Sequence, residues 1–173
     1  MAALVLTGAC RGKHSRTTVE NEEPGEAAPR MAATLKMSDP AAPAQLIKGF
    51  YGLEGGSWRW TAGHFTIMLR SPLSAAQHGG TLLLAFTIPD VVIQKINSFT
   101  LTASVGTTKL KSEPYAKAGA YTFSADLPAE LLTKETVNVD FALDKFIQSG
   151  TQPANTDQRE LGVIVTSAGL ETK

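Results

Sequence analysis

Residues 49–61, Gly49-Phe50-Tyr51-Gly52-Leu53-Glu54-Gly55-Gly56-Ser57-Trp58-Arg59-Trp60-Thr61, have the pattern of a β-hairpin. Two β-prone runs flank Gly55-Gly56, a dipeptide typical of a tight turn between strands. Side chains alternate between the two faces of a strand, so Trp58 and Trp60 share one face and Arg59 takes the other. One face of this hairpin can enter a core, whereas Arg59 needs a polar partner. We expect the rest of the chain to build a sandwich around it.

Short strands separated by glycine, proline and polar loops make up most of the remaining sequence. Alternating or continuous apolar patterns predict further strands at 63–70, 81–88, 99–105, 118–125, 136–143 and 160–167. Residues 107–110 either extend the strand before them or pair back after a turn at Gly106. Brief helical turns are expected at 89–95 and 127–134, and loops at 71–80 and 144–157. The pattern predicts an all-β fold: an antiparallel, jelly-roll-like β-sandwich with one or two short helical turns. A single cysteine excludes the disulfide framework of antibody domains.

The bulk composition is that of an ordinary globular protein. The chain has 173 residues, of which 43% are hydrophobic, enough for one domain with a sizeable core. Its 16 basic and 16 acidic residues give a formal net charge of zero. No excess of positive charge indicates a nucleic-acid partner, and no apolar run approaches the roughly 20 residues that span a bilayer.

The N-terminal residues suggest a cellular location. Residues 1–10 resemble the end of a bacterial lipoprotein signal peptide, because a short apolar, small-residue run ends at Cys10 and polar residues follow. Cys10 would then carry the lipid anchor, and Arg11 directly after it favours the outer over the inner membrane of a bacterial cell envelope. The alternative is a cytosolic N-terminus with an incidental cysteine. Residues 11–43, poor in large apolar side chains, are expected to form a flexible tether, and 44–173 the sandwich domain.

Both ends of the predicted domain resemble a known kind of module. Gly49-Phe50-Tyr51, Glu54 and Trp58-Arg59-Trp60 at the start, with Asp157-Gln158-Arg159-Glu160-Leu161-Gly162 near the end, are similar to a β-sandwich module of bacterial polysaccharide and glycosyltransferase proteins. The similarity covers roughly residues 46–170. It implies a sandwich fold in a cell-envelope or glycan context and transfers no catalytic residue.

The sequence lacks the motifs of common enzyme classes. There is no Gly-x-Ser-x-Gly elbow, P-loop, dinucleotide fingerprint or His-Glu-x-x-His pattern. The three histidines, His14, His64 and His78, have no metal-ligand spacing. We therefore expect no catalytic residues, no metal and no cofactor.

A polar set and an aromatic set are the candidate binding residues. Glu54, Arg59, Asp157 and Arg159 could grip a carboxylate or sugar hydroxyls, or could form an ion-paired clasp between the hairpin and the end of the chain. Tyr51 and Trp58 could stack on a sugar ring, or could belong to the core. The sequence thus leaves two functions open: a module that binds a glycan or an envelope protein, and a structural or assembly domain without a small ligand.

Overall fold

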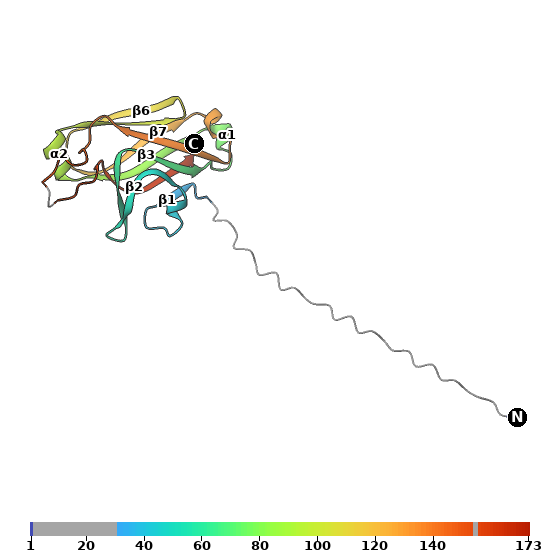
Figure 1. Cartoon of the computed structure of the whole chain (residues 1–173). Helices are drawn as coiled ribbons and strands as arrows, with labels where there is room; N and C mark the ends of the chain where they lie inside the picture. The colour runs from blue at the N-terminus through green and yellow to red at the C-terminus, as the bar shows by residue number, and fades with distance from the viewer. Residues whose placement is uncertain (2–30, 154–155) are drawn as a thin grey trace.

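The computed structural model describes Met1, residues 31–153 and residues 156–173, and Figure 1 shows their arrangement. In this part of the chain the strands are β1 (Thr34–Lys36), β2 (Leu46–Glu54), β3 (Trp58–Arg70), β4 (Gly80–Ile88), β5 (Phe99–Val105), β6 (Thr108–Tyr115), β7 (Gly119–Leu127), β8 (Thr136–Leu143) and β9 (Ile164–Thr172). The helical segments are α1 (Ala75–His78), α2 (Asp90–Ile96) and the 3-10 turns η1 (Ala42–Ala44) and η2 (Ala129–Leu132). The predicted all-β class with short helical turns is confirmed.

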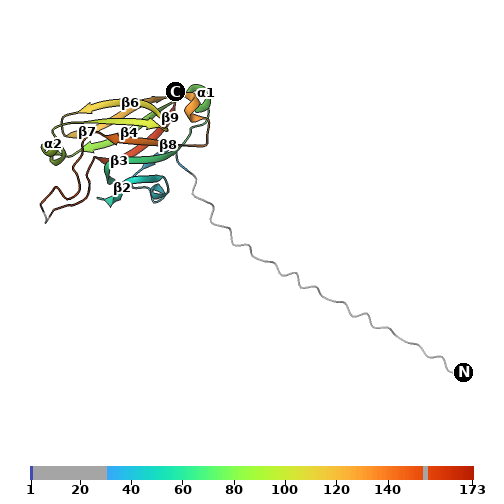
Figure 2. The ribbon, with the colours of Figure 1, turned by 45° about the horizontal axis from the view of Figure 1, so that its top comes forward.

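All strand pairs are antiparallel, and the sheet folds over into two layers (Figure 2). One layer has the order β6-β5-β8-β3, with β2 beside β3; the other has the order β9-β4-β7, with β1 beside β9. The long strand β3 joins the layers, because it pairs with β9 through Arg59 and Trp60 and with β8 farther along. The open edges β6 and β7 are bridged where Lys111 Nζ donates a hydrogen bond to the Ser124 carbonyl at 3.0 Å. The chain crosses repeatedly between layers, which makes the sandwich jelly-roll-like.

The core lies between the layers and follows the predicted alternation. On β3 the side chains of Phe65, Ile67 and Leu69 are fully buried, whereas His64 and Arg70 are exposed. On β8 every second residue from Val137 to Leu143 is buried. Aromatic rings pack at the centre of the core, where those of Phe65 and Phe141 stack with centroids 4.9 Å apart. Burial of this apolar surface is the main favourable contribution to the folding free energy.

The N-terminal boundary of the domain corrects the predicted tether. Residues 34–43 pack onto the sandwich: β1 pairs with β9, and the side chains of Leu35, Met37 and Ala42 are buried. Gln45, only 2% exposed, fixes this segment: its side chain accepts from the Ala32 N–H and donates to the carbonyls of Ala32 and Met68. The expected tether is thereby wrong for residues 31–43, and its remainder, 11–30, lies outside the described residues, as does Cys10.

The observed strands differ from the predicted ones most clearly in three parts of the chain. The strands expected at 58–61 and 63–70 are one continuous strand, β3. Residues 108–115 pair back against β5 after the turn at Gly106, which decides between the two alternatives for this segment. The closing strand begins at Ile164 rather than 160 and runs to Thr172. Alanine and glycine at 168–169 have low β-propensity, so tertiary pairing with β4 and β1 decides the conformation there.

Candidate functional site

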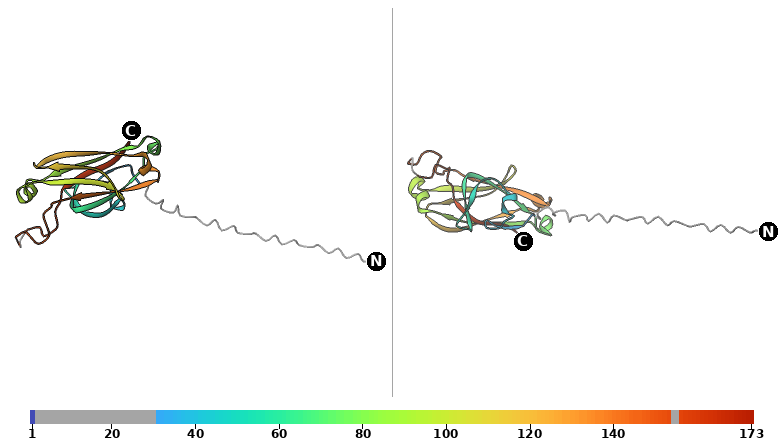
Figure 3. Two further views of the ribbon diagram at one scale, coloured as in Figure 1. Left: turned by 90° about the horizontal axis from the view of Figure 1, so that it is seen from above. Right: turned by 60° about the horizontal axis from the view of Figure 1, so that its bottom comes forward.

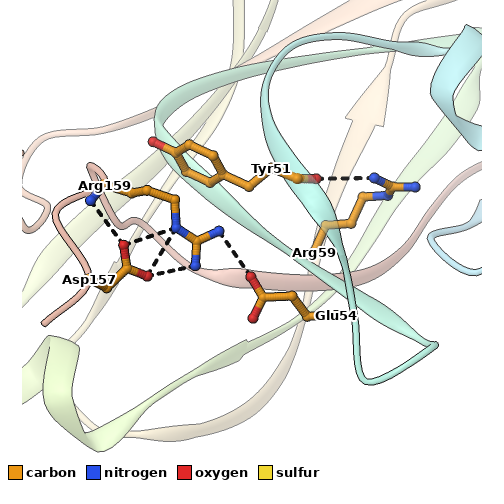
Figure 4. Close-up of polar contacts among 5 residues, drawn as sticks. All are labelled: Tyr51, Glu54, Arg59, Asp157 and Arg159. Carbon is orange, nitrogen blue, oxygen red and sulfur yellow. Dashed lines mark hydrogen bonds and ion pairs between the residues drawn. The ribbon is translucent and has the colours of Figure 1, made fainter.

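Four of the six predicted site residues meet around the guanidinium group of Arg159 (Figure 4). Arg159 and Asp157 belong to the β8–β9 loop, and Tyr51 and Glu54 to β2. Nε of Arg159 lies 3.0 Å from both carboxylate oxygens of Asp157, and Nη2 lies 2.6 Å from Oδ2. Nη1 donates to Glu54 Oε1 at 2.9 Å. The guanidinium carbon lies 4.8 Å from the centre of the Tyr51 ring, which is cation–π geometry. We call these four residues the clasp.

The clasp places one cation, Arg159, between two carboxylates. Hydrogen bonds from the Arg159 side chain and backbone lower the pKa of Asp157, and the side-chain hydrogen bonds of Arg159 to Asp157 and Glu54 raise the pKa of Arg159. Burial, together with the charge of Glu160, raises the pKa of Tyr51. Each of the three guanidinium nitrogens directs one N–H at a carboxylate, so three of the five donors of Arg159 are engaged within the clasp. The clasp is also not fully buried: the side chains of Arg159, Glu54 and Asp157 are 33%, 36% and 35% exposed.

The structure separates the other two predicted residues from this ion cluster. Glu54 pairs with Trp58 and Leu53 with Arg59, so strand alternation places Arg59 on the opposite face from Glu54. Arg59 Nη1 donates instead to the Tyr51 carbonyl at 3.1 Å, and its buried Nε has no partner among the described residues. Trp58 is partly buried and covers the hairpin turn. A Cβ added at Gly55 would lie 2.6 Å from the indole nitrogen, so glycine is needed there.

The β8–β9 loop, which carries Asp157 and Arg159, also forms a pocket with the end of α2. This loop pocket has a volume of about 500 Å³ and is lined by Lys95, Ile96, Asp144, Lys145, Phe146, Ile147, Gln148 and Thr151. In Figure 2 the loop and α2 lie at the same end of the sandwich. Sequence reasoning did not find this pocket, because its lining side chains carry no local motif and meet only through tertiary structure.

The wall of the loop pocket is held by hydrogen bonds. Ile147 and Leu161 exchange two backbone hydrogen bonds of 2.9 and 3.0 Å, and both side chains are buried. Asp144 Oδ1 accepts the N–H of Thr100 at 2.6 Å at the start of the loop. Phe146 packs directly over Gly63, where a Cβ would lie 2.1 Å from the ring. Together with the clasp, these contacts fix both ends of the loop to the sandwich.

Two other depressions lie on the described surface. One of about 550 Å³ runs between the β5–β6 turn and η2, and its rim is rich in threonine. The other, of about 350 Å³, lies over β4 and β7. Like the loop pocket, neither is lined by a predicted site residue.

The potential metal ligands of the described residues lie apart from one another. Within residues 31–153 and 156–173, no three His, Cys, Asp or Glu side chains are grouped to hold a metal ion. His64 lies exposed on β3 with its ring 6.2 Å from that of Phe146, and His78 ends α1; His14 lies outside the described residues. No helix in the described part of the chain is long and apolar enough to cross a membrane.

Comparison with known proteins identifies no family. No family model matches the sequence, and no curated protein matches it. Among solved structures, one similar fold is a family GH115 4-O-methyl-α-glucuronidase with specificity for decorated arabinogalactans, at 10% identity and a TM-score of 0.46. The match covers 87% of this chain but only 19% of that one. Another is CsCBM6-3 from Clostridium stercorarium in complex with cellobiose, at 12% identity and a TM-score of 0.42, covering 82% of this chain and 95% of that one.

Proposed function

We propose that this domain is a non-catalytic module that binds a glycan in the loop pocket. The observation that carries the proposal is the lining of this pocket, which combines one aromatic ring, Phe146, with hydrogen-bonding side chains such as Gln148 and Thr151. Sugars have the same two-sided character, because their C–H faces pack on aromatic rings while their hydroxyl groups need donors and acceptors. The volume of about 500 Å³ lies in the range of small-molecule sites.

In this proposal the clasp has a supporting role. Arg159 ties the β8–β9 loop to the tip of β2, and the loop then presents its pocket-lining residues in a fixed arrangement. A preformed pocket binds more tightly than a mobile one, because less conformational entropy is lost on binding. Tyr51 and Trp58 are weaker candidates for a sugar platform, since Arg159 covers one face of Tyr51 and Trp58 covers the turn at Gly55.

The test is a glycan-array screen of the full chain, followed by calorimetric titration with the best oligosaccharide. The pocket proposal expects Gln148→Ala to weaken binding about fivefold, the effect of losing one hydrogen bond of about 1 kcal/mol. Trp58→Ala should leave the affinity unchanged. Loss of binding in Trp58→Ala but not in Gln148→Ala would move the site to the hairpin and overturn the pocket assignment.

A second candidate function is a structural or assembly domain without a small ligand. The pairing of Arg159 with two carboxylates favours it, because these contacts join the first hairpin to the last loop without a ligand. A stably folded chain that binds no oligosaccharide in the screen would support this alternative. Capture of an envelope protein, abolished by substitutions on one face of the sandwich, would identify the partner as a protein.

The proposed location is the bacterial cell envelope, with a lipid on Cys10 and the outer membrane preferred. Its support is the sequence alone: the change from apolar to polar residues at Cys10. Two or more lipid chains anchor a protein stably, whereas one does so marginally. Expression of the gene with its upstream region in its own host, followed by fractionation, tests the location. Membrane-bound protein that becomes soluble in Cys10→Ser supports it; soluble protein in both cases, with Met1 retained, contradicts it.

A further inference from the structure

We propose that the loop pocket selects an acidic sugar and that Lys95 and Lys145 bind its carboxylate. This inference rests on the proposed function and specifies the ligand class. The two lysines come from different elements, the last turn of α2 and the start of the β8–β9 loop, and both line the same pocket. Two lysines in the lining of one cavity favour an anion in it, because each ammonium group is stabilised by an opposite charge.

Neither of the two lysines in the pocket lining is neutralised by a carboxylate of the described residues. Among the other described lysines, Lys48, Lys111 and Lys173 pair with a carboxylate, whereas Lys36, Lys109, Lys117 and Lys134 do not. Lys95 and Lys145 are both exposed, and neither forms an ion pair with another residue in the described part of the chain. Their charges are therefore available to a bound group.

The single carboxylate in the pocket lining is already committed to the backbone. Asp144 Oδ1 accepts the Thr100 N–H at 2.6 Å and so helps to hold the loop against β5. Two lysines against one aspartate leave the lining with a net positive charge. A neutral sugar would leave this charge without a partner, whereas a uronic acid would supply one.

The remaining lining suits the rest of a sugar ring. Phe146 offers an apolar surface, and Gln148 offers both a donor and an acceptor at the rim. Thr151 Oγ1 donates to the Gln148 carbonyl at 2.7 Å, which leaves the oxygen of this hydroxyl as an acceptor for a sugar hydroxyl group. An acidic monosaccharide unit therefore finds a charged, a polar and an apolar partner in one pocket.

The test is calorimetric titration of the full chain with oligogalacturonate and with a neutral galacto-oligosaccharide of equal length. Lys95→Ala and Lys145→Ala should each weaken oligogalacturonate binding about fivefold, as expected for an exposed ion pair worth up to about 1 kcal/mol. Neither change should affect the neutral sugar. The matched control is Lys109→Ala, on the exposed face of β6, which should change neither affinity. Raising NaCl from about 0.05 M to about 0.5 M should weaken only the acidic ligand, because salt screens the lysine charges.

The outcomes separate this inference from the proposed function. Equal binding of both sugars, with the two lysine variants unchanged, overturns the acidic selectivity and leaves glycan binding intact. An equal loss in Lys109→Ala would mean general charge attraction, which also overturns it. Failure to bind either sugar here, with no binding to any glycan in the array screen, removes the proposed function itself.

Discussion

Arg159 and Glu54 lie 105 residues apart in the sequence, yet Nη1 of the arginine is 2.9 Å from Oε1 of the glutamate. This contact joins the tip of the β2–β3 hairpin to the loop before β9. Asp157 holds the same guanidinium from the other side, two residues away in the chain. The side chain of Arg159 thus connects the first hairpin of the sandwich to its last loop.

Replacement of Arg159 tests the strength of the clasp. A fully buried pair would cost about 3–5 kcal/mol on losing one partner, but these side chains are about one-third exposed, so solvent screens part of the interaction. We expect Arg159→Ala to lower the free energy of unfolding by about 1–2 kcal/mol. The midpoints of urea-induced unfolding of wild type and Arg159→Ala measure this loss of stability. Arg70→Ala, an exposed arginine on β3, should stay within about 0.5 kcal/mol of wild type. An unchanged midpoint in Arg159→Ala would show that the clasp contributes nothing.

The lowered pKa of Asp157 predicts a pH dependence of stability. A carboxyl group with a depressed pKa in the folded state stabilises the fold above its unfolded pKa of about 4, and this contribution disappears as the pH falls through the folded-state value. Wild type should therefore be more stable than Asp157→Asn at pH 7, and the gap should narrow toward pH 2. The midpoints of denaturant-induced unfolding, measured for both proteins between pH 2 and pH 7, test this expectation. A stability difference that does not change with pH would contradict it.

Truncation tests the corrected boundary of the domain. A chain beginning at Ala44 lacks β1 and the buried side chains of Leu35 and Met37, each worth about 1.5–3 kcal/mol. We expect its melting temperature to fall by more than about 10 °C relative to a chain beginning at Met31. Differential scanning calorimetry of the two chains measures the difference. Equal melting temperatures would mean that the first strand contributes no stability.

Gly63 is predicted to shape the loop pocket. A methyl group at this position would lie 2.1 Å from the Phe146 ring, so Gly63→Ala must displace the ring. The expected results are weaker oligosaccharide binding and a changed environment for the Phe146 ring in NMR spectra. Gly52→Ala is the matched control, because nothing lies within 4 Å of its added methyl group. Unaltered binding in Gly63→Ala would exclude Phe146 from the site.

Local sequence patterns were sufficient to predict most of the strands. The alternation of Phe65, Ile67 and Leu69 defines their core face, and the same holds for β8. The first strand was missed because three residues contain too few alternations to stand out among Ala, Ser and Pro. The spacing of Leu35 and Met37, with polar neighbours between and beside them, was the only local signal for it.

The candidate site was less predictable for a physical reason. Glu54, Asp157 and Arg159 were predicted as a polar set that could form an ion-paired clasp, and they do meet in the structure. The loop pocket depends instead on how α2 packs beside residues 144–151, which no local pattern encodes. Arg59 was grouped with the clasp because it is close in sequence, whereas its face of the strand points elsewhere.

The pairing of β1 with β9 determines how this domain can be displayed on a surface. The Ala33 carbonyl accepts the N–H of Leu170, so the first described strand and the last residues of the chain lie side by side (Figure 3). They lie at the α1 end of the sandwich, and β4, whose nine residues span about 27 Å, leads from there toward α2. Immobilisation through either end of the described domain would therefore leave the loop pocket facing outward, within reach of a polymer in the surrounding medium.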